Sequence, residues 1–312
     1  MTTVVITDCD FGDGSVEAEV LGGGFRLAQV EAHTEDDVIS AASEADGLLV
    51  QWAPISKRVL AALPGLQAIV RYGVGLDNVD VEAAARHGVQ VSNVPDYCID
   101  EVAEHTVSLI CAAARRLSPL DRLTGEGEWA PNLVPKPLRF ADDPVGVAGL
   151  GRIGQAVVRR LLGLGFPVMV YDPLVGPTTF PELRRASSLE ELGSWVNHLT
   201  LHMPATPDTT GMCDGQVIKA LGPRGHLVNT SRGALVDEDA LLAALNSGQL
   251  WRASLDVLLH EPPTGSSAEL TRHPSVLATP HIGYLSTESA HNLRQRAAAR
   301  LKELLAVTSG GA

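Results

Sequence analysis

The segment Val145–Gly154 reads VGVAGLGRIG and carries a G-x-G-x-x-G pattern at Gly149, Gly151 and Gly154. Apolar residues precede the pattern and an Ala- and Leu-rich stretch follows it, which indicates a strand, a tight turn and a helix. The first glycine permits the turn, the second lets the backbone approach a pyrophosphate, and the third allows close packing of helix on strand. Because the helix N-terminus attracts phosphate charge, this segment predicts a dinucleotide-binding unit.

The next predicted strand ends at Asp172, and 172 − 154 = 18 positions separate it from Gly154. A carboxylate at this place can accept hydrogen bonds from both hydroxyls of an adenosine ribose. It would repel a 2′-phosphate, and residues 173–179 (PLVGPTT) contain no arginine to neutralise one. The sequence therefore favours NAD(H) over NADP(H). The competing interpretation is that the glycines only shape a turn and that Asp172 only caps a strand.

Short apolar runs alternate with helix-length segments along the rest of the chain, which is typical of parallel strands with crossover helices. One series covers residues 3–94 and a second covers residues 144–281. A helix-like segment at 100–117 joins them, and the Gly- and Pro-rich residues 123–144 predict a long loop. We expect an α/β fold with two doubly wound, parallel-sheet (Rossmann-like) domains and an active-site cleft between them.

Composition narrows the class of protein. The chain has 312 residues, is 45% hydrophobic and has a mean hydropathy of +0.10, which is typical of folded globular domains. Its formal net charge of −13 disfavours nucleic acid and anionic lipid as partners. No stretch reaches membrane-spanning length, and the four scattered cysteines suggest neither disulfides nor a metal site. We therefore expect a cytoplasmic protein without a structural metal.

Three further segments, each directly after a strand-like run, contain residues suited to catalysis: NTSRG at 229–233, DVLLHEP at 256–262 and TPHIG at 279–283. Ligands of doubly wound folds bind at the carboxyl ends of strands, so Arg232, Glu261 and His281 can converge there. Together they would supply a cation for an anionic substrate, an imidazole for proton transfer and a carboxylate to orient that imidazole. The alternatives are an ordinary strand end, a surface carboxylate and a structural histidine.

With these motifs the sequence closely resembles the D-isomer-specific 2-hydroxyacid dehydrogenase family over nearly its whole length. The motifs follow the family's order: RYGVGLDNVD, GLGRIG, LHMPATPDTTG, LVNTSRGALVDEDAL, LDVLLHEP and TPHIG. The resemblance implies a substrate domain built from residues 1–99 and 287–312, and an NAD-binding domain at 100–286. It also implies a homodimer joined through the nucleotide domains.

The resemblance assigns roles residue by residue. Arg232 binds the substrate, Glu261 partners the histidine, and His281 is the general acid or base. The backbone amides of Val74 and Gly75 hold the substrate carboxylate. Cofactor contacts are implied for Thr106, Gly149, Gly151, Arg152, Ile153, Gly154, Asp172, Met203, Pro204, Thr230, Asp256, His281 and Gly283.

Several details resemble the branch of the family that includes the C-terminal-binding proteins, among them VPDYCIDEVAEHT and GYLSTES. In that branch Arg71 would be an additional substrate-side arginine. Tyr284, three positions after His281, stands where the animal proteins have tryptophan and would give the substrate pocket a different shape.

The leading hypothesis is an NAD-dependent oxidoreductase that transfers a hydride between nicotinamide and a small 2-keto or D-2-hydroxy acid. His281 would protonate the carbonyl oxygen during reduction and accept the proton during oxidation. A second hypothesis is an NAD(H)-sensing corepressor or scaffold resembling the C-terminal-binding proteins. A third is the same chemistry on a phosphonate or a phosphorylated 2-keto acid.

Overall fold

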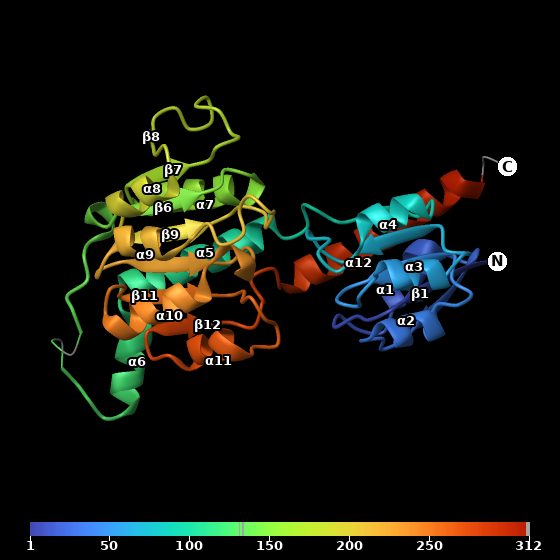
Figure 1. Ribbon diagram of the computed structural model, residues 1–312, viewed down its shortest axis with the longest axis horizontal. Helices are drawn as coiled ribbons and strands as arrows, with labels where there is room; N and C mark the ends of the chain where they lie inside the picture. The colour runs from blue at the N-terminus through green and yellow to red at the C-terminus, as the bar shows by residue number, and fades with distance from the viewer. Residues whose placement is uncertain (131, 133, 310–312) are drawn as a thin grey trace. The chain divides into compact units, whose positions relative to one another are not determined.

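The computed structural model describes residues 1–130, 132 and 134–309 and divides the chain into two compact units (Figure 1). Unit 1 comprises Met1–Cys98 together with the chain from Leu285 onward, and unit 2 comprises Ile99–Tyr284. Each unit is built on one parallel sheet. The fold class predicted from the sequence, α/β with two Rossmann-like parallel sheets, is confirmed.

Unit 1 contains a five-stranded sheet in the order β2-β1-β3-β4-β5, with every pair of neighbours parallel. Its strands are β1 (Thr2–Ile6), β2 (Phe25–Gln29), β3 (Gly47–Val50), β4 (Ala68–Arg71) and β5 (Gln90–Ser92). The central strand β3, with sequence GLLV, is buried along its whole length, as expected for a parallel strand covered on both faces.

The helices of unit 1 are α1 (Ser15–Leu21), α2 (Glu35–Ala41), α3 (Lys57–Ala62), α4 (Val81–Arg86) and α12 (Thr287–Ser309). Leu48 and Val50 of β3 belong to the core that includes residues of α2, α3 and α4. Gly47 faces the other way, because a Cβ added there would lie 3.0 Å from the Leu305 side chain of α12. Helices therefore cover both faces of this sheet.

Unit 2 contains a seven-stranded parallel sheet in the order β12-β11-β10-β9-β6-β7-β8. The strands are β6 (Val145–Ala148), β7 (Val168–Tyr171), β8 (Arg184–Arg185), β9 (His198–Leu201), β10 (His226–Asn229), β11 (Arg252–Leu255) and β12 (Val276–Ala278). From β6 the chain moves outward to β8 and then returns to β9 on the other side of β6. This reversal is the topological switch point at which doubly wound sheets bind ligands.

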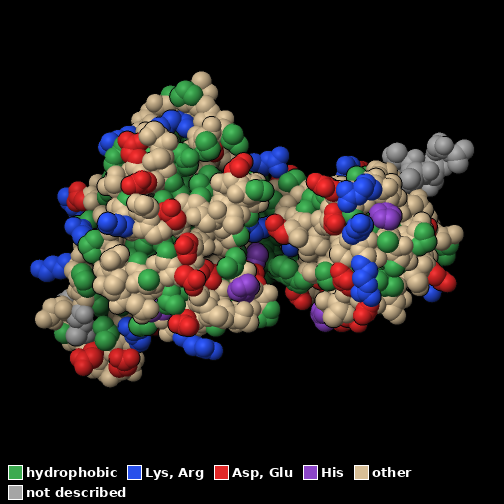
Figure 2. Space-filling view, viewed as in Figure 1, with side chains coloured by type: hydrophobic (Ala, Val, Ile, Leu, Met, Phe, Trp, Pro, Cys, Tyr) green, Lys and Arg blue, Asp and Glu red, His purple; other side chains and the backbone are tan. Residues whose placement is uncertain are grey.

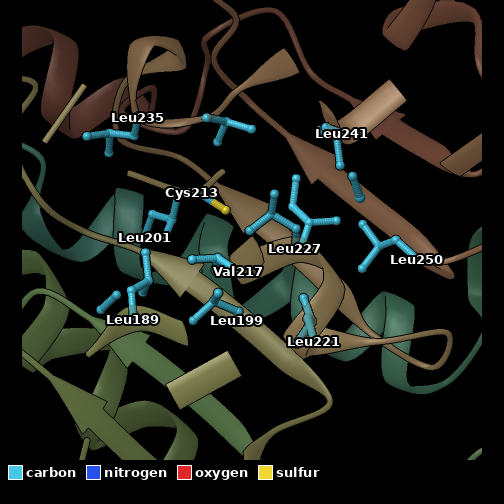
Figure 3. Close-up of a cluster of buried hydrophobic side chains, with 14 of the residues drawn as sticks. Leu189, Leu199, Leu201, Cys213, Val217, Leu221, Leu227, Leu235, Leu241 and Leu250 are labelled. Atoms are coloured by element: carbon cyan, nitrogen blue, oxygen red, sulfur yellow. The ribbon is translucent and has the colours of Figure 1, made fainter. Parts of the chain in front are cut away.

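The helices of unit 2 are α5 (Ile99–Ala114), α6 (Leu117–Gly125), α7 (Arg152–Gly163), α8 (Leu189–Trp195), α9 (Gly215–Leu221), α10 (Glu238–Ser247) and α11 (Gly265–Arg272). Residues of α5 and α7 share one core with β6 and β7. In the second core, Leu199 and Leu227 of the sheet meet Leu189, Val217 and Leu241 of α8, α9 and α10 (Figure 3).

The predicted helix at 100–117 is broken in the structure, because Arg116 adopts a left-handed backbone with φ 62° between α5 and α6. The loop expected at 123–144 is shorter than predicted, since α6 reaches Gly125 and a 3₁₀ turn spans Phe140–Asp142. Pro119 lies in the first turn of α6, where its missing N–H costs no helical hydrogen bond. The short elements β8 and α11 were not anticipated.

Acidic and basic side chains are interspersed over the face shown in Figure 2. In the part of the chain that the structure describes, no helix is both long and apolar enough to cross a bilayer.

Candidate active site

The parallel strands of unit 2 all end at the same edge of the sheet, so the segments that follow them are brought together there. These segments begin at Gly149, Asp172, Ala186, His202, Thr230, Asp256 and Thr279. All the cofactor and catalytic residues predicted from the sequence in this unit, apart from Thr106, belong to these segments or to the first turn of α7.

The three glycines of the pattern have different surroundings. A Cβ at Gly149, where φ is 98°, would lie 2.5 Å from the His202 carbonyl oxygen. A Cβ at Gly154 would lie 1.9 Å from the carbonyl oxygen of Gly149. At Gly151 an added Cβ meets no described atom within 4 Å. The outer glycines are therefore required by packing, whereas the middle one keeps a surface open.

Gly151 is the N-cap of α7, and no side chain caps this helix end. The first N–H groups of a helix have no partner within the helix. An open surface beside uncapped N–H groups at the switch point fits a dinucleotide pyrophosphate.

Asp172 is held in place by backbone N–H groups. Its Oδ2 accepts from Leu150 at 2.6 Å, and its Oδ1 accepts from Leu174 at 2.8 Å and Val175 at 2.9 Å. An ionised carboxylate offers about four lone-pair positions, so three protein donors leave room for a further one. The carboxylate is thus oriented by the glycine turn itself and can still accept from a ribose hydroxyl.

Thr106 and Thr230 are both buried, and their hydroxyl groups are 2.8 Å apart. The Thr106 hydroxyl also donates to the Val102 carbonyl within α5. The bond between the two threonine hydroxyl groups joins α5 to the end of β10. The predicted contact of Thr106 with a cofactor phosphate stays a prediction.

His281 and Glu261 share a hydrogen bond, with 2.7 Å between Nδ1 and Oε2, and this contact becomes an ion pair when the imidazole is protonated. The other Glu261 oxygen accepts from the Leu258 N–H at 2.8 Å. Burial alone would raise the pKa of Glu261, but the hydrogen bond and charge of His281 outweigh it and lower that pKa. Because Glu261 contacts Nδ1, proton exchange with a substrate would take place at Nε2 of His281. The two side chains are 25% and 34% exposed.

Asp256 fixes the loop that carries His281. Its carboxylate accepts from the Thr279 hydroxyl at 2.6 Å and from the N–H groups of Ile282 and Gly283 at 3.0 and 2.8 Å. Its carbonyl accepts from the His281 N–H at 2.8 Å. His281 has φ 53°, an unfavourable value for a residue with a Cβ, and these bonds hold it there.

Burial alone would raise the pKa of Asp256, but hydrogen bonds from His105, Thr279 and the loop N–H groups lower it. His105 Nε2 lies 3.5 Å from Asp256 Oδ1. His105 was not among the residues singled out from the sequence, because no local pattern links it to a residue 151 positions away (256 − 105 = 151). The cofactor contact that the resemblance implies for Asp256 stays a prediction.

Arg232 follows β10 in a loop shaped by Asn229. The Asn229 side chain donates to the Arg232 carbonyl at 2.8 Å, and the Arg232 guanidinium donates to the Ser231 carbonyl at 2.8 Å. A Cβ on Gly233 would lie 2.0 Å from the carbonyl carbon of Leu258. The Arg232 loop therefore abuts the segment that carries Glu261, so the three predicted catalytic residues share one edge of unit 2.

Glu238 supports this edge and was not identified from the sequence. It is 6% exposed and accepts from the Leu259 N–H at 2.8 Å and from the Ser267 hydroxyl. Through these bonds it positions the segment that leads to Glu261. Its only signal was its place in the LVNTSRGALVDEDAL motif, six residues after Arg232.

The remaining predicted residues are Tyr284 in unit 2 and a group at the end of β4 in unit 1. Tyr284 ends unit 2, with its ring centroid 6.2 Å from that of His281. Arg71 ends β4 in unit 1, followed by Val74 and Gly75. Within the described residues, no protein group accepts a hydrogen bond from the N–H of Val74 or Gly75. These two donors could therefore serve a bound carboxylate.

The fold and the glycine turn define a Rossmann-type nucleotide-binding protein. The family model described as "D-isomer specific 2-hydroxyacid dehydrogenase, NAD binding domain" matches residues 107–283, which is more than half of the chain. The chain therefore belongs to the D-isomer specific 2-hydroxyacid dehydrogenase family, with NAD as the cofactor of unit 2.

D-3-phosphoglycerate dehydrogenase of Mycobacterium tuberculosis is 39% identical over 271 residues, which is 86% of this chain and 51% of the relative. The chain thus spans about half the length of that relative. A protein of Thermus thermophilus has a similar structure, with a TM-score of 0.85, 32% identity and coverage of 99% and 97% of the two chains. A pyruvate reductase of Chlamydomonas reinhardtii gives a TM-score of 0.83 and 27% identity, with 98% and 96% covered.

Proposed function

We propose that this protein is an NAD-dependent oxidoreductase acting on a small 2-keto or D-2-hydroxy acid. The observation that carries the proposal is the 2.7 Å pair of His281 and Glu261 on the carboxyl edge of an NAD-binding sheet. The loop of Arg232 abuts the same segment. When bound, the nicotinamide supplies or accepts the hydride.

The remaining chemistry belongs to side chains of this chain. In reduction, His281 Nε2 donates a proton to the substrate carbonyl oxygen, and in oxidation it accepts that proton. Glu261 holds the imidazole in the tautomer and orientation that this step requires. Arg232 holds the substrate carboxylate or carbonyl through its planar guanidinium.

The N–H groups of Val74 and Gly75, with Arg71 beside them, bind the substrate carboxylate in this proposal. Tyr284 contributes to the shape of the pocket next to His281. Residues that would hold the cofactor are Gly151 and the first turn of α7 with Arg152 and Ile153, then Asp172, and the strand-end residues Met203, Pro204, Thr230 and Gly283. Membership of the C-terminal-binding-protein branch stays a prediction.

A 2-keto acid panel tests the reaction class. We expect NADH to be consumed with at least one 2-keto acid, NADPH to be a poorer donor because of Asp172, and the product to have the D configuration. His281→Asn is expected to bind NADH and to reduce the acid slowly. Absence of turnover with every acid, despite measurable NADH binding, would overturn the proposal.

We also propose a homodimer formed through unit 2. Helix α6 and the residues after it carry the exposed side chains of Leu117 and Trp129, the latter 87% exposed. A dimer interface that covers them would remove this apolar surface from water. Sedimentation analysis of the wild type and of Trp129→Ser tests this, because a monomeric wild type would contradict it.

A further inference from the structure

The carboxyl edge of the sheet in unit 1 carries side chains that the family-level function does not explain. Strand β3 lies between β1 and β4, so Trp52, two residues after β3, emerges between Asp10 and Arg71. Trp52 is 42% exposed, which is unusual for the largest apolar side chain.

Two carboxylates hold Trp52 at both ends. Asp8, which is buried, accepts from the backbone N–H groups of Gln51 at 3.0 Å, of Ala53 at 3.1 Å and of Trp52 itself. Asp10 accepts from the indole N–H of Trp52 at 3.0 Å. Because backbone and indole are both anchored, little side-chain entropy remains to be lost when a ligand covers the ring.

Arg71 lies against this ring. Its Nε donates to the Gln51 carbonyl at 3.2 Å, and its guanidinium carbon is 5.3 Å from the centroid of the Trp52 ring. A Cβ on Gly73 would lie 1.7 Å from the Arg71 Nη1, so the glycine makes space for the guanidinium. The arginine and the indole thus stand side by side, next to the Val74 and Gly75 N–H groups.

The charge at this edge restricts what can bind. Among the described side chains bonded to the Gln51–Ala53 segment, Asp8 and Asp10 are acidic and Arg71 is basic, which leaves an excess of one negative charge. In the proposed function Arg71 serves the substrate carboxylate. Among these described groups there is no second cation for a further anionic group such as a phosphate, which needs its own cationic donors.

We infer that the substrate of the proposed reaction is a 2-keto acid with an uncharged, apolar side chain, aromatic or branched, that packs against the face of Trp52. This inference rests on the proposed function. It differs from the phosphorylated substrate named for the mycobacterial relative. An anchored indole favours a flat or branched apolar group because it offers contact area without further ordering.

The test compares kcat/KM for four acids with NADH: phenylpyruvate, 4-methyl-2-oxopentanoate, glyoxylate and 3-phosphohydroxypyruvate. We expect the first two to exceed the phosphorylated acid by ~100-fold or more, which corresponds to about 2.7 kcal/mol. Trp52→Ala is expected to lower kcat/KM for these two by ~10-fold or more. It should lower kcat/KM for glyoxylate, which has no side chain to pack on the ring, by a clearly smaller factor, because only the contact of Arg71 with the ring is then lost.

Two further variants test whether the effect depends on the anchored indole of Trp52. Asp10→Ala releases the indole and should raise KM for phenylpyruvate while kcat stays close to the wild-type value. Leu164→Ala removes another exposed apolar side chain, in unit 2, and should leave the ranking of acids unchanged. Thermal unfolding and NADH binding of each variant confirm that it is folded.

The outcomes separate the inference from the proposed function. If no acid is reduced, the proposed function fails. If acids are reduced but the phosphorylated one is best, or Trp52→Ala weakens glyoxylate as much as phenylpyruvate, only the inference is overturned.

Discussion

The carboxyl edges of the two sheets are organised by different kinds of interaction. In unit 2 the nucleotide edge depends on backbone shape, with glycines that permit close contacts and N–H groups that orient Asp172. In unit 1 the corresponding edge is fixed by buried charges that come from distant parts of the chain. A site based on backbone shape can be recognised in a short motif, whereas one based on distant charges cannot.

The buried charges of unit 1 centre on Glu17, which is fully buried in α1. Its carboxylate accepts from two nitrogens of Arg294 in α12, at 2.9 and 2.7 Å, and from the Tyr72 hydroxyl at 2.8 Å. Burial and the charge of Glu17 raise the pKa of Tyr72 well above its ordinary value. Glu17 therefore ties both helices to the end of β4, directly before the Val74–Gly75 loop.

The largest expected effect is on the chemistry of unit 2. His281→Asn should lower kcat by ~10²- to 10⁴-fold, because the proton donor is lost, with little change in NADH affinity. His33→Asn, at an exposed position in unit 1, is the control. Retention of wild-type kcat by His281→Asn would contradict the role of His281.

The next largest expected effect is the loss of folding stability when the charge network of unit 1 is broken. Arg294→Met leaves Glu17 buried without its cation and should lower the free energy of unfolding by ~3–5 kcal/mol. Arg296→Met, which removes an exposed ion pair to Asp96, should cost at most about 1 kcal/mol. Urea unfolding measures both. Equal effects of the two substitutions would mean that burial of the Glu17 pair has no special importance.

The glycine turn offers a matched pair of substitutions. Gly154→Ala should cost ~1–3 kcal/mol of stability or more, because its Cβ would collide with the Gly149 carbonyl oxygen. Gly151→Ala should cost less than ~1 kcal/mol, since the added Cβ enters open space. We expect it instead to weaken NADH binding by ~10-fold, seen by fluorescence titration and equal to about 1.4 kcal/mol. Unchanged NADH affinity in Gly151→Ala would place the pyrophosphate elsewhere.

The smallest expected effect concerns a charge network at the opposite, amino edge of the sheet in unit 2. Asp143 lies 3.1 Å from His198 Nε2, and His198 Nδ1 lies 3.0 Å from His226 Nδ1. Burial alone would raise the pKa of Asp143, but the hydrogen bond and charge of His198 lower it. A lowered folded-state pKa means that the folded protein binds fewer protons than the unfolded one.

Stability from Asp143 is therefore present above its ordinary pKa of 3.8 and is lost as the pH falls through the lower, folded-state value. Asp143→Asn should lower the melting temperature at pH 7 and reduce the loss of stability on acidification. Asp142→Asn, at a half-exposed neighbour, is the control. Identical acid sensitivity of Asp143→Asn and the wild type would contradict this account.

Local patterns predicted the strand–turn–helix at Gly149–Gly154, because glycine spacing and apolar runs act over a few residues. Local patterns also singled out Glu261 and His281, because each follows a strand of a parallel sheet and the carboxyl ends of such strands lie at one edge. In the structure these two side chains share a hydrogen bond. Sequence alone could not reveal the bond between Glu17 and Arg294, which are 277 positions apart. Nor could it reveal the hydrogen bonds from backbone N–H groups after β3 to the Asp8 carboxylate. Such contacts depend on how distant elements pack.

The most direct test of the central claim is the rate of NADH oxidation by wild type and His281→Asn with phenylpyruvate, together with the configuration of the product. The account predicts D-phenyllactate from the wild type and a rate lower by ~10²-fold or more in the variant. Formation of the L-acid, or equal rates in the two proteins, would contradict it.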